Sequence, residues 1–139
     1  MYRLFYVSRA TSLPNTDQLA ELVRVARLRN QSANLTGLLC GAGPYFLQVL
    51  EGPIVPVNRL LERLFRDPRH TDLTLLSSGP CATRLFPNWG MRLVSVADLP
   101  DDECARLLAT DPPDSIDPQH LLAFLCRLSD QTARLRTRA

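Results

Sequence analysis

The stretch from Gly43 to Pro53 has the pattern of a buried strand with a polar residue at its centre. Residues 45–50 are a run of aromatic and aliphatic side chains, and Gln48 interrupts that run. A primary amide offers two N–H donors and one acceptor oxygen. Burying it without partners costs about 1–3 kcal/mol. Gln48 therefore needs hydrogen-bond partners, and it is the first candidate for chemistry.

Four further polar residues fall on otherwise apolar elements. Tyr6 lies in the first expected strand, and Asn30 at the end of the first expected helix. Arg63 and Asp67 lie four residues apart on the second helix, so they share a face. Each has an ordinary interpretation: a core aromatic, a helix C-cap, and a surface ion pair of little energetic value. Together with Gln48 they could instead line one slot between two helices above a sheet, which suits a flat ligand.

Hydrophobic alternation predicts the strands that position these residues. We place five of them over residues 2–8, 34–41, 45–51, 71–78 and 89–96. Because side chains alternate along a strand, Leu4 and Tyr6 share one face of the first strand. The same rule puts Phe46, Gln48 and Leu50 on one face of the third strand. The turn at 42–44 predicts that the second and third strands form a hairpin.

Two helices are expected between these strands. Asn15 is a predicted N-cap, and Gln18 completes a capping box three residues later. The helix that follows runs to about Asn30, with apolar residues at the spacing of one helical face. The second helix has Pro56 in its first turn and ends at the Asp67–Pro68 pair.

The resulting order, βαββαββ, predicts an α+β fold: a ferredoxin-like βαββαβ core with an extra fifth strand. Both helices are expected on one face of a mixed, mainly antiparallel sheet. Residues 1–96 would form this domain, and residues 97–139 a C-terminal helical extension. Within that extension we expect a short helix near 101–109 and a final helix over 118–139.

Composition argues against several chemistries. The four cysteines are scattered without a C-x-x-C pair, so no zinc site is expected. We expect these cysteines to be buried or half-buried free thiols. The sequence contains no lysine, which excludes a P-loop lysine and a Schiff-base lysine. His70 and His120 are interpreted as surface or capping residues. The net charge of +2 is too small to indicate a nucleic-acid partner.

The hydropathy of the chain predicts a cytoplasmic protein without a membrane partner. No apolar run approaches the roughly 18 residues of a membrane span. The N-terminus has no apolar segment of the signal-peptide kind.

Five motifs resemble those of one known family, in the same order and at the same spacing. They are FYVSRAT, RNQSANLTGLL, FLQVLEGP, RDPRH and RLFPNWGMRLV. This pattern is similar to the BLUF domain, a flavin-binding sensor of blue light, and it covers roughly residues 2–96. The remaining residues resemble the two C-terminal helices of the short, stand-alone members. The resemblance implies the ferredoxin-like fold that the periodicity also predicts.

The resemblance also implies roles for individual residues. Tyr6 matches the photoactive tyrosine, which gives an electron and a proton to the excited flavin. Gln48 matches the signalling glutamine between that tyrosine and atoms N5 and O4 of the flavin. Asn30 matches the asparagine that hydrogen-bonds the edge of the isoalloxazine ring. Arg63 and Asp67 match positions that contact the pyrimidine side of the flavin.

Four other positions match the family less completely. Trp89 and Met91 match a tryptophan and a methionine of strand five that are implicated in signal relay. Arg29 stands where relatives carry various polar residues, and we expect it to contribute to flavin binding. His70 matches its motif but acquires no role from the resemblance.

By resemblance, the chain is expected to be a photoreceptor that binds FAD non-covalently and is not a turnover enzyme. Its output would pass through the C-terminal helices to an unidentified partner protein or into self-assembly as a dimer or larger ring. Two alternatives stay open. A flavin oxidoreductase is disfavoured by the lack of a nicotinamide-binding fingerprint. A flavin-free ferredoxin-like interaction module would leave Gln48 and Tyr6 as coincidences.

Overall fold

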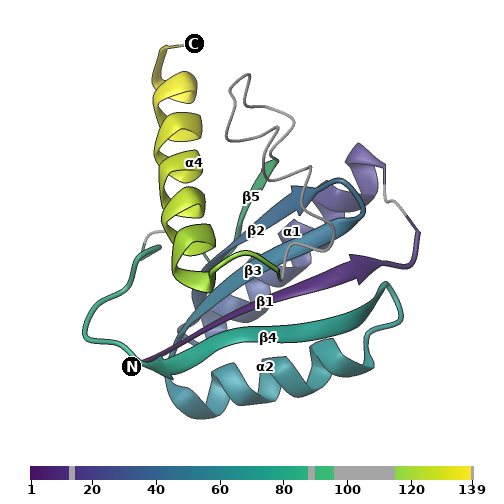
Figure 1. The fold of residues 1–139 in the computed structure, drawn as a ribbon, viewed down its shortest axis with the longest axis vertical. Coiled ribbons are helices and arrows are strands. Elements are labelled where there is room, and N and C mark those ends of the chain that lie inside the picture. The colour runs from purple at the N-terminus through teal and green to yellow at the C-terminus, as the bar shows by residue number, and fades with distance from the viewer. Residues whose placement is uncertain (13–14, 88–89, 96–114, 139) are drawn as a thin grey trace.

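The computed structural model describes residues 1–12, 15–87, 90–95 and 115–138. Its elements are β1 (Tyr2–Ala10), α1 (Thr16–Ser32), β2 (Thr36–Ala42), β3 (Tyr45–Gly52), α2 (Ile54–Arg66), β4 (His70–Pro80), β5 (Arg92–Ser95) and α4 (Pro118–Arg138) (Figure 1). The predicted βαββαββ order and the final helix are confirmed. Trp89 and the helix expected near 101–109 lie outside the described residues.

The five strands form one mixed sheet in the order β4-β1-β3-β2-β5. The first four pair antiparallel, as in a ferredoxin-like sheet, and β5 is added parallel to β2. In the β1–β3 ladder, Tyr6 lies directly opposite Gln48. In the β2–β3 ladder, Leu39 lies opposite Gln48 on its other side. The amide of Gln48 is therefore near the centre of the sheet.

The two faces of the sheet carry separate apolar cores. Residues of α1 and α2 pack on the face that presents Leu4, Tyr6 and Leu50. Residues of α4 pack on the opposite face, which presents Phe5 and Val7. The prediction that α1 and α2 share one face is confirmed, as is the alternation expected for β1 and β3. Figure 1 shows α4 crossing the sheet on the side away from α1.

Local sequence accounts for the first helix, and a contact with α1 accounts for the short last strand. The capping box is present: the Asn15 side chain accepts from the backbone N–H of Gln18, and the Gln18 side chain accepts from that of Asn15. β5 begins at Arg92 and not at residue 89 as expected. The reason is that α1 holds the preceding backbone: the carbonyl oxygen of Met91 accepts a 2.6 Å hydrogen bond from Arg27 Nε. A Cβ on Gly90 would come within 3.1 Å of the Arg27 carbonyl oxygen, so this close approach favours glycine.

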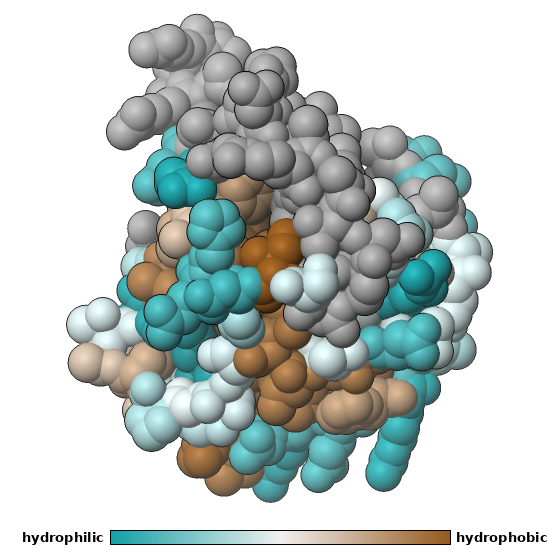
Figure 2. Space-filling model, viewed as in Figure 1, coloured by the Kyte–Doolittle hydropathy of each residue, from teal (hydrophilic) through white to brown (hydrophobic). Residues whose placement is uncertain are grey.

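β4 is an edge strand with an irregular pattern of exposure. Its half-buried positions recur every third residue and not every second, and two register shifts interrupt its pairing with β1. Such bulges twist an edge strand and discourage edge-to-edge association. One apolar residue of β4, Leu75, is 42% exposed. Figure 2, viewed as Figure 1, shows apolar side chains gathered near the middle of this side of the molecule, with polar side chains around them.

A buried carboxylate holds the backbone at Leu85 and Phe86, after β4. Glu51, at the end of β3, is fully buried and accepts hydrogen bonds from Arg3 Nε and from the backbone N–H groups of Leu85 and Phe86, each at 2.8 Å. Phe86 is thereby placed in the core beneath α4. Nothing in the local sequence indicates this arrangement, because the partners are 34 or more residues from Glu51.

We expect the Glu51→Gln variant to lose about 2 kcal/mol of unfolding free energy. The amide keeps one acceptor oxygen, so at least one buried backbone N–H loses its partner. Urea unfolding of the variant and the wild type measures the difference. Glu62→Gln is the matched control, because Glu62 is an exposed carboxylate on α2. Equal stabilities of Glu51→Gln and the wild type would contradict this account.

Other expectations concern cysteines, metals and membranes. Cys40, Cys81 and Cys126 form no disulfide, as predicted; Cys104 lies outside the described part of the chain. In that described part, no group of three or more His, Cys, Asp or Glu side chains is arranged to hold a metal ion. Nor is any of its helices both long and apolar enough to cross a membrane.

Candidate functional site

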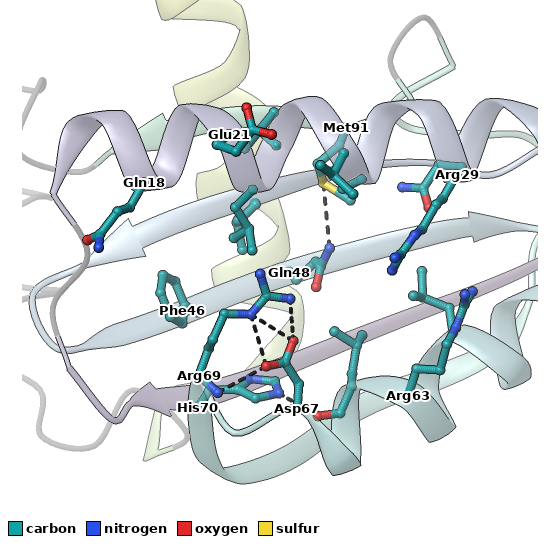
Figure 3. Close-up of a pocket in the computed structure, with 18 of the residues that line it drawn as sticks. Gln18, Glu21, Arg29, Phe46, Gln48, Arg63, Asp67, Arg69, His70 and Met91 are labelled. Carbon is teal, nitrogen blue, oxygen red and sulfur yellow. Dashed lines mark hydrogen bonds and ion pairs between the residues drawn. The ribbon is translucent and has the colours of Figure 1, made fainter.

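A cavity of about 720 Å³ opens between α1 and α2 above the sheet. The six residues expected to bind a ligand all line it: Tyr6, Arg29, Asn30, Gln48, Arg63 and Asp67. Met91 lines it too. Figure 3 shows Gln48 at the centre, Arg29 and Arg63 towards one end, and Gln18 and Phe46 towards the other. The structure thus brings together residues that are up to 85 positions apart in the sequence, as Tyr6 and Met91 are.

The buried amide of Gln48 has partners on both sides. The side chain is only 7% exposed. Its Oε1 accepts a short hydrogen bond from the Tyr6 hydroxyl. Its Nε2 donates to the sulfur of Met91 at 3.5 Å (Figure 3). Since a thioether is a weak acceptor, the bond to Met91 is the weaker of the two.

The phenol of Tyr6 is held in its protonated form. Tyr6 is 2% exposed, and burial raises the pKa of its hydroxyl well above the ordinary value. The negative charge of Asp67 raises that pKa further. At neutral pH the hydroxyl therefore keeps its proton and donates it in the hydrogen bond to Gln48.

The expected ion pair between Arg63 and Asp67 is not formed. Asp67 pairs with Arg69 instead: Nη2 of Arg69 lies 2.6 Å from Oδ2, and Nε lies 2.9 and 3.0 Å from the two carboxylate oxygens. The reason is that Asp67 is the C-cap of α2 with an extended backbone, so it has left the helical face that carries Arg63. Hydrogen bonds from Arg69 hold the pKa of Asp67 below its usual value. Arg69 also lines the cavity and was not expected there.

Asn30 is not the C-cap of the first helix. α1 continues to Ser32 and its C-cap is Ala33. Asn30 is buried, and its Nδ2 donates to the carbonyl oxygen of Gly90 at 2.6 Å. This bond and the one from Arg27 fasten the residues before β5 to the wall of the cavity.

His70 is a cavity residue to which sequence reasoning gave no role beyond surface or cap. Its Nε2 lies 2.5 Å from the carbonyl oxygen of Leu64, in the last turn of α2, so the capping interpretation is confirmed. Its Nδ1 lies 2.8 Å from the hydroxyl of Ser8. The signal that could have found it is its place directly after a helix end, within the motif RDPRH.

The cavity has the chemistry that a flat, heteroaromatic ring requires. Its volume falls in the range of about 300–1,000 Å³ that is typical of ligand sites. Apolar side chains form its walls and floor: Val23, Ala26, Leu39, Phe46, Leu60 and Leu64. Polar and charged side chains also line it, and they come from different elements, so they can orient a bound ligand. Among the described residues, Met91 accepts from Gln48 Nε2, and the second N–H of that amide can serve a ligand acceptor.

Comparison with known proteins identifies the family. Residues 1–92 match the family described as sensors of blue light using FAD, or BLUF. The photoactivated adenylate cyclase subunit beta of Euglena longa is 38% identical over 92 residues. The corresponding subunit of Euglena gracilis is 37% identical over the same length. Each alignment covers 65% of this chain and 11% of the relative, so this chain spans about a tenth of those proteins.

Solved structures agree with this assignment. The dark-state structure of BlrB, a BLUF protein, superimposes with a TM-score of 0.72 at 30% identity, over 88% of this chain and 94% of that one. The ground state of BlsA superimposes with a TM-score of 0.74 at 30% identity, over 91% of this chain and 86% of that one. The predicted ferredoxin-like fold with an added strand and C-terminal helix is therefore confirmed. The chain belongs to the BLUF family, whose members sense blue light using FAD.

Proposed function

We propose that this chain is a blue-light photoreceptor that holds FAD non-covalently in the cavity between α1 and α2. The observation that carries the proposal is the hydrogen-bonded series Tyr6–Gln48–Met91, which lines one apolar cavity. Such a series has a proton donor at one end and a residue next to β5 at the other. A proton transfer at Tyr6 could therefore change the hydrogen bonds of Gln48 and shift the position of Met91.

Several residues would hold the ring. Asn30, Arg29, Arg63 and Asp67 would contact its polar edge, since each lines the cavity from α1 or the α2 region. FAD would supply the absorption of blue light and an acceptor for one electron and one proton. Tyr6 would donate both from its phenol and take both back, so the cycle would have no net redox change.

Gln48 would act as the switch. In the arrangement seen here, its oxygen faces Tyr6 and its nitrogen faces Met91. Rotation of the amide would turn its oxygen towards the Met91 sulfur, where neither atom carries a proton to donate. The hydrogen bond to Met91 would then be lost, and Met91 would be free to shift. This is a local hydrogen-bond change that biases a conformational equilibrium.

The signal would leave the cavity through the residues around β5. Met91 immediately precedes β5, which pairs with β2. We place Trp89 on the same route because of its position two residues earlier. Residues 1–96 would form the sensor domain and residues 97–139 the output extension, of which α4 is the described part. The relatives named above are adenylate cyclase subunits; for this chain we propose an output through a partner protein or through self-assembly as a dimer or larger ring.

The test is the absorption spectrum of the purified protein. We expect a yellow preparation whose flavin bands move to the red under blue light and return in the dark. A colourless protein that takes up no flavin on reconstitution would favour an interaction module and contradict the proposal. Bleaching of the flavin by NAD(P)H in the dark, without a light-induced shift, would favour an oxidoreductase. Pull-downs compared in light and dark would then identify the partner.

A further inference from the structure

His70 connects three elements around Tyr6. Its Nδ1 lies 2.8 Å from the hydroxyl of Ser8 on β1, and its Nε2 lies 2.5 Å from the carbonyl oxygen of Leu64 on α2. Its ring meets the ring of Tyr6 edge-on, with centroids 6.1 Å apart and planes at 68°. The residue itself begins β4. One side chain thus contacts β1, α2 and the proposed photoactive phenol.

The two ring nitrogens have distinct tasks. A carbonyl oxygen can only accept, so Nε2 carries a proton and donates to Leu64. The hydroxyl of Ser8 is buried and can donate to Nδ1. Ser8 and Tyr6 are two residues apart on β1 and point to the same face of the sheet. The bond to Ser8 therefore fixes the imidazole relative to the strand that carries Tyr6.

The contact with α2 fixes the surroundings of Tyr6 as well. The carbonyl oxygen of Leu64 also accepts from the backbone N–H of Asp67 at 3.2 Å. His70 is thus attached to the turn that carries the carboxylate of Asp67. The imidazole therefore contacts both the ring of Tyr6 and the turn that carries the carboxylate acting on Tyr6.

We propose that His70 is a positioning residue for Tyr6, holding the phenol in register with Gln48 through its hydrogen bonds to Ser8 and Leu64. This inference rests on the proposed function, because it assigns His70 a part in the photochemistry of Tyr6. It predicts that the two hydrogen bonds, and not ring packing alone, set the lifetime of the light state.

Three variants separate these contributions. His70→Phe keeps an aromatic ring against Tyr6 but removes both hydrogen bonds. His70→Gln supplies an N–H for Leu64 and an oxygen for Ser8, so it is the conservative rescue. Ser8→Ala removes only the bond to Nδ1. His120→Phe is the matched control, since His120 is an exposed histidine on α4.

The measurements are the size of the light-minus-dark shift and the lifetime of the light state, both at full flavin occupancy. We expect His70→Phe to change the lifetime by about tenfold. This is the effect of changing the barrier to dark recovery by the free energy of about one hydrogen bond. Ser8→Ala should change it by about threefold, and His70→Gln and His120→Phe should stay close to the wild type. If His70→Phe fails to bind flavin, the lifetimes of the light state in Ser8→Ala and His70→Gln test the inference instead. A changed lifetime in Ser8→Ala beside a wild-type lifetime in His70→Gln would support it, and an unchanged lifetime in Ser8→Ala would overturn it.

Unchanged lifetimes in both His70→Phe and Ser8→Ala, beside a normal wild type, would overturn the inference and leave the proposed function intact. Equal changes in His70→Phe and His70→Gln would also overturn it, because the hydrogen bonds would then not matter. A wild type that binds flavin but shows no light-induced red shift would instead contradict the proposed function, and this inference with it.

Discussion

The Gln48→Leu variant is expected to bind flavin and to show no red shift under blue light. Leucine has a similar volume and suits the apolar strand around position 48, so the cavity keeps its shape. It can neither accept from the Tyr6 hydroxyl nor donate to the Met91 sulfur. Both hydrogen bonds of the proposed switch are therefore lost in one substitution. The light-minus-dark absorption spectrum measures the result.

Stability should change only modestly in this variant. The Tyr6 hydroxyl loses its acceptor, which costs about 1–3 kcal/mol, but a buried amide is removed at the same time. Gln119→Leu is the matched control, because Gln119 is exposed on α4. A wild-type red shift in Gln48→Leu would show that the switch lies elsewhere, and the amide would then have a purely structural role.

Strand periodicity was sufficient to predict which neighbours share a face with Tyr6 and which share a face with Gln48. Side chains of a strand alternate for steric reasons, so the pattern of apolar residues reveals the buried faces. That Tyr6 stands directly opposite Gln48 could not be predicted this way. The register of β1 against β3 depends on how the chain returns through α1 and the hairpin, and no local pattern encodes it.

The surroundings of Asp67 show where local rules fail. The spacing of Arg63 and Asp67 predicts an ion pair only if both residues are helical. The helix ends at Arg66, and the extended backbone of Asp67 turns its carboxylate towards Arg69. The sequence predicts this end at the Asp67–Pro68 pair, about one residue too late, and that single residue decides the partner of Asp67.

The packing position of α4 could likewise not be predicted from the sequence. The spacing of Leu121, Leu125 and Leu128 gives α4 an apolar stripe, and these side chains are fully buried or nearly so. The stripe does not say which face of the sheet it covers. In the structure α4 packs opposite the cavity, in one core with Phe86. The proposed signal from Gln48 would therefore have to cross the sheet to reach α4.

The chain supplies a connection for that crossing. Phe86 belongs to the core beneath α4, and Met91, five residues later, belongs to the core beside the cavity. Glu51 holds the first end of this segment, and Asn30 holds the second through Gly90. A shift of Met91 after rotation of Gln48 would thus act on a segment that is anchored under α4. This arrangement supports the proposed route of the signal and was not visible in the motifs.

The Tyr6→Phe variant is expected to bind flavin and to form the red-shifted state at least about 100-fold less efficiently than the wild type. Phenylalanine retains the ring that packs in the core beside His70. It lacks the hydroxyl that donates to Gln48 Oε1, and it has no proton to give. That proton is present at neutral pH in the wild type, and burial and Asp67 raise the pKa of Tyr6 further above neutral.

The yield of the red-shifted state per absorbed photon measures the effect of Tyr6→Phe, and flavin fluorescence provides a second readout. We expect fluorescence to increase, because removing the phenol removes the nearest proposed electron donor. Tyr2→Phe is the matched control: Tyr2 lies on the same strand and face but packs at the margin of the core, away from the cavity lining. Loss of the photocycle in Tyr6→Phe but not in Tyr2→Phe would assign proton and electron donation to one hydroxyl. An unchanged yield in Tyr6→Phe would exclude that hydroxyl as the donor, and the hydrogen bond to Gln48 would then only orient the amide.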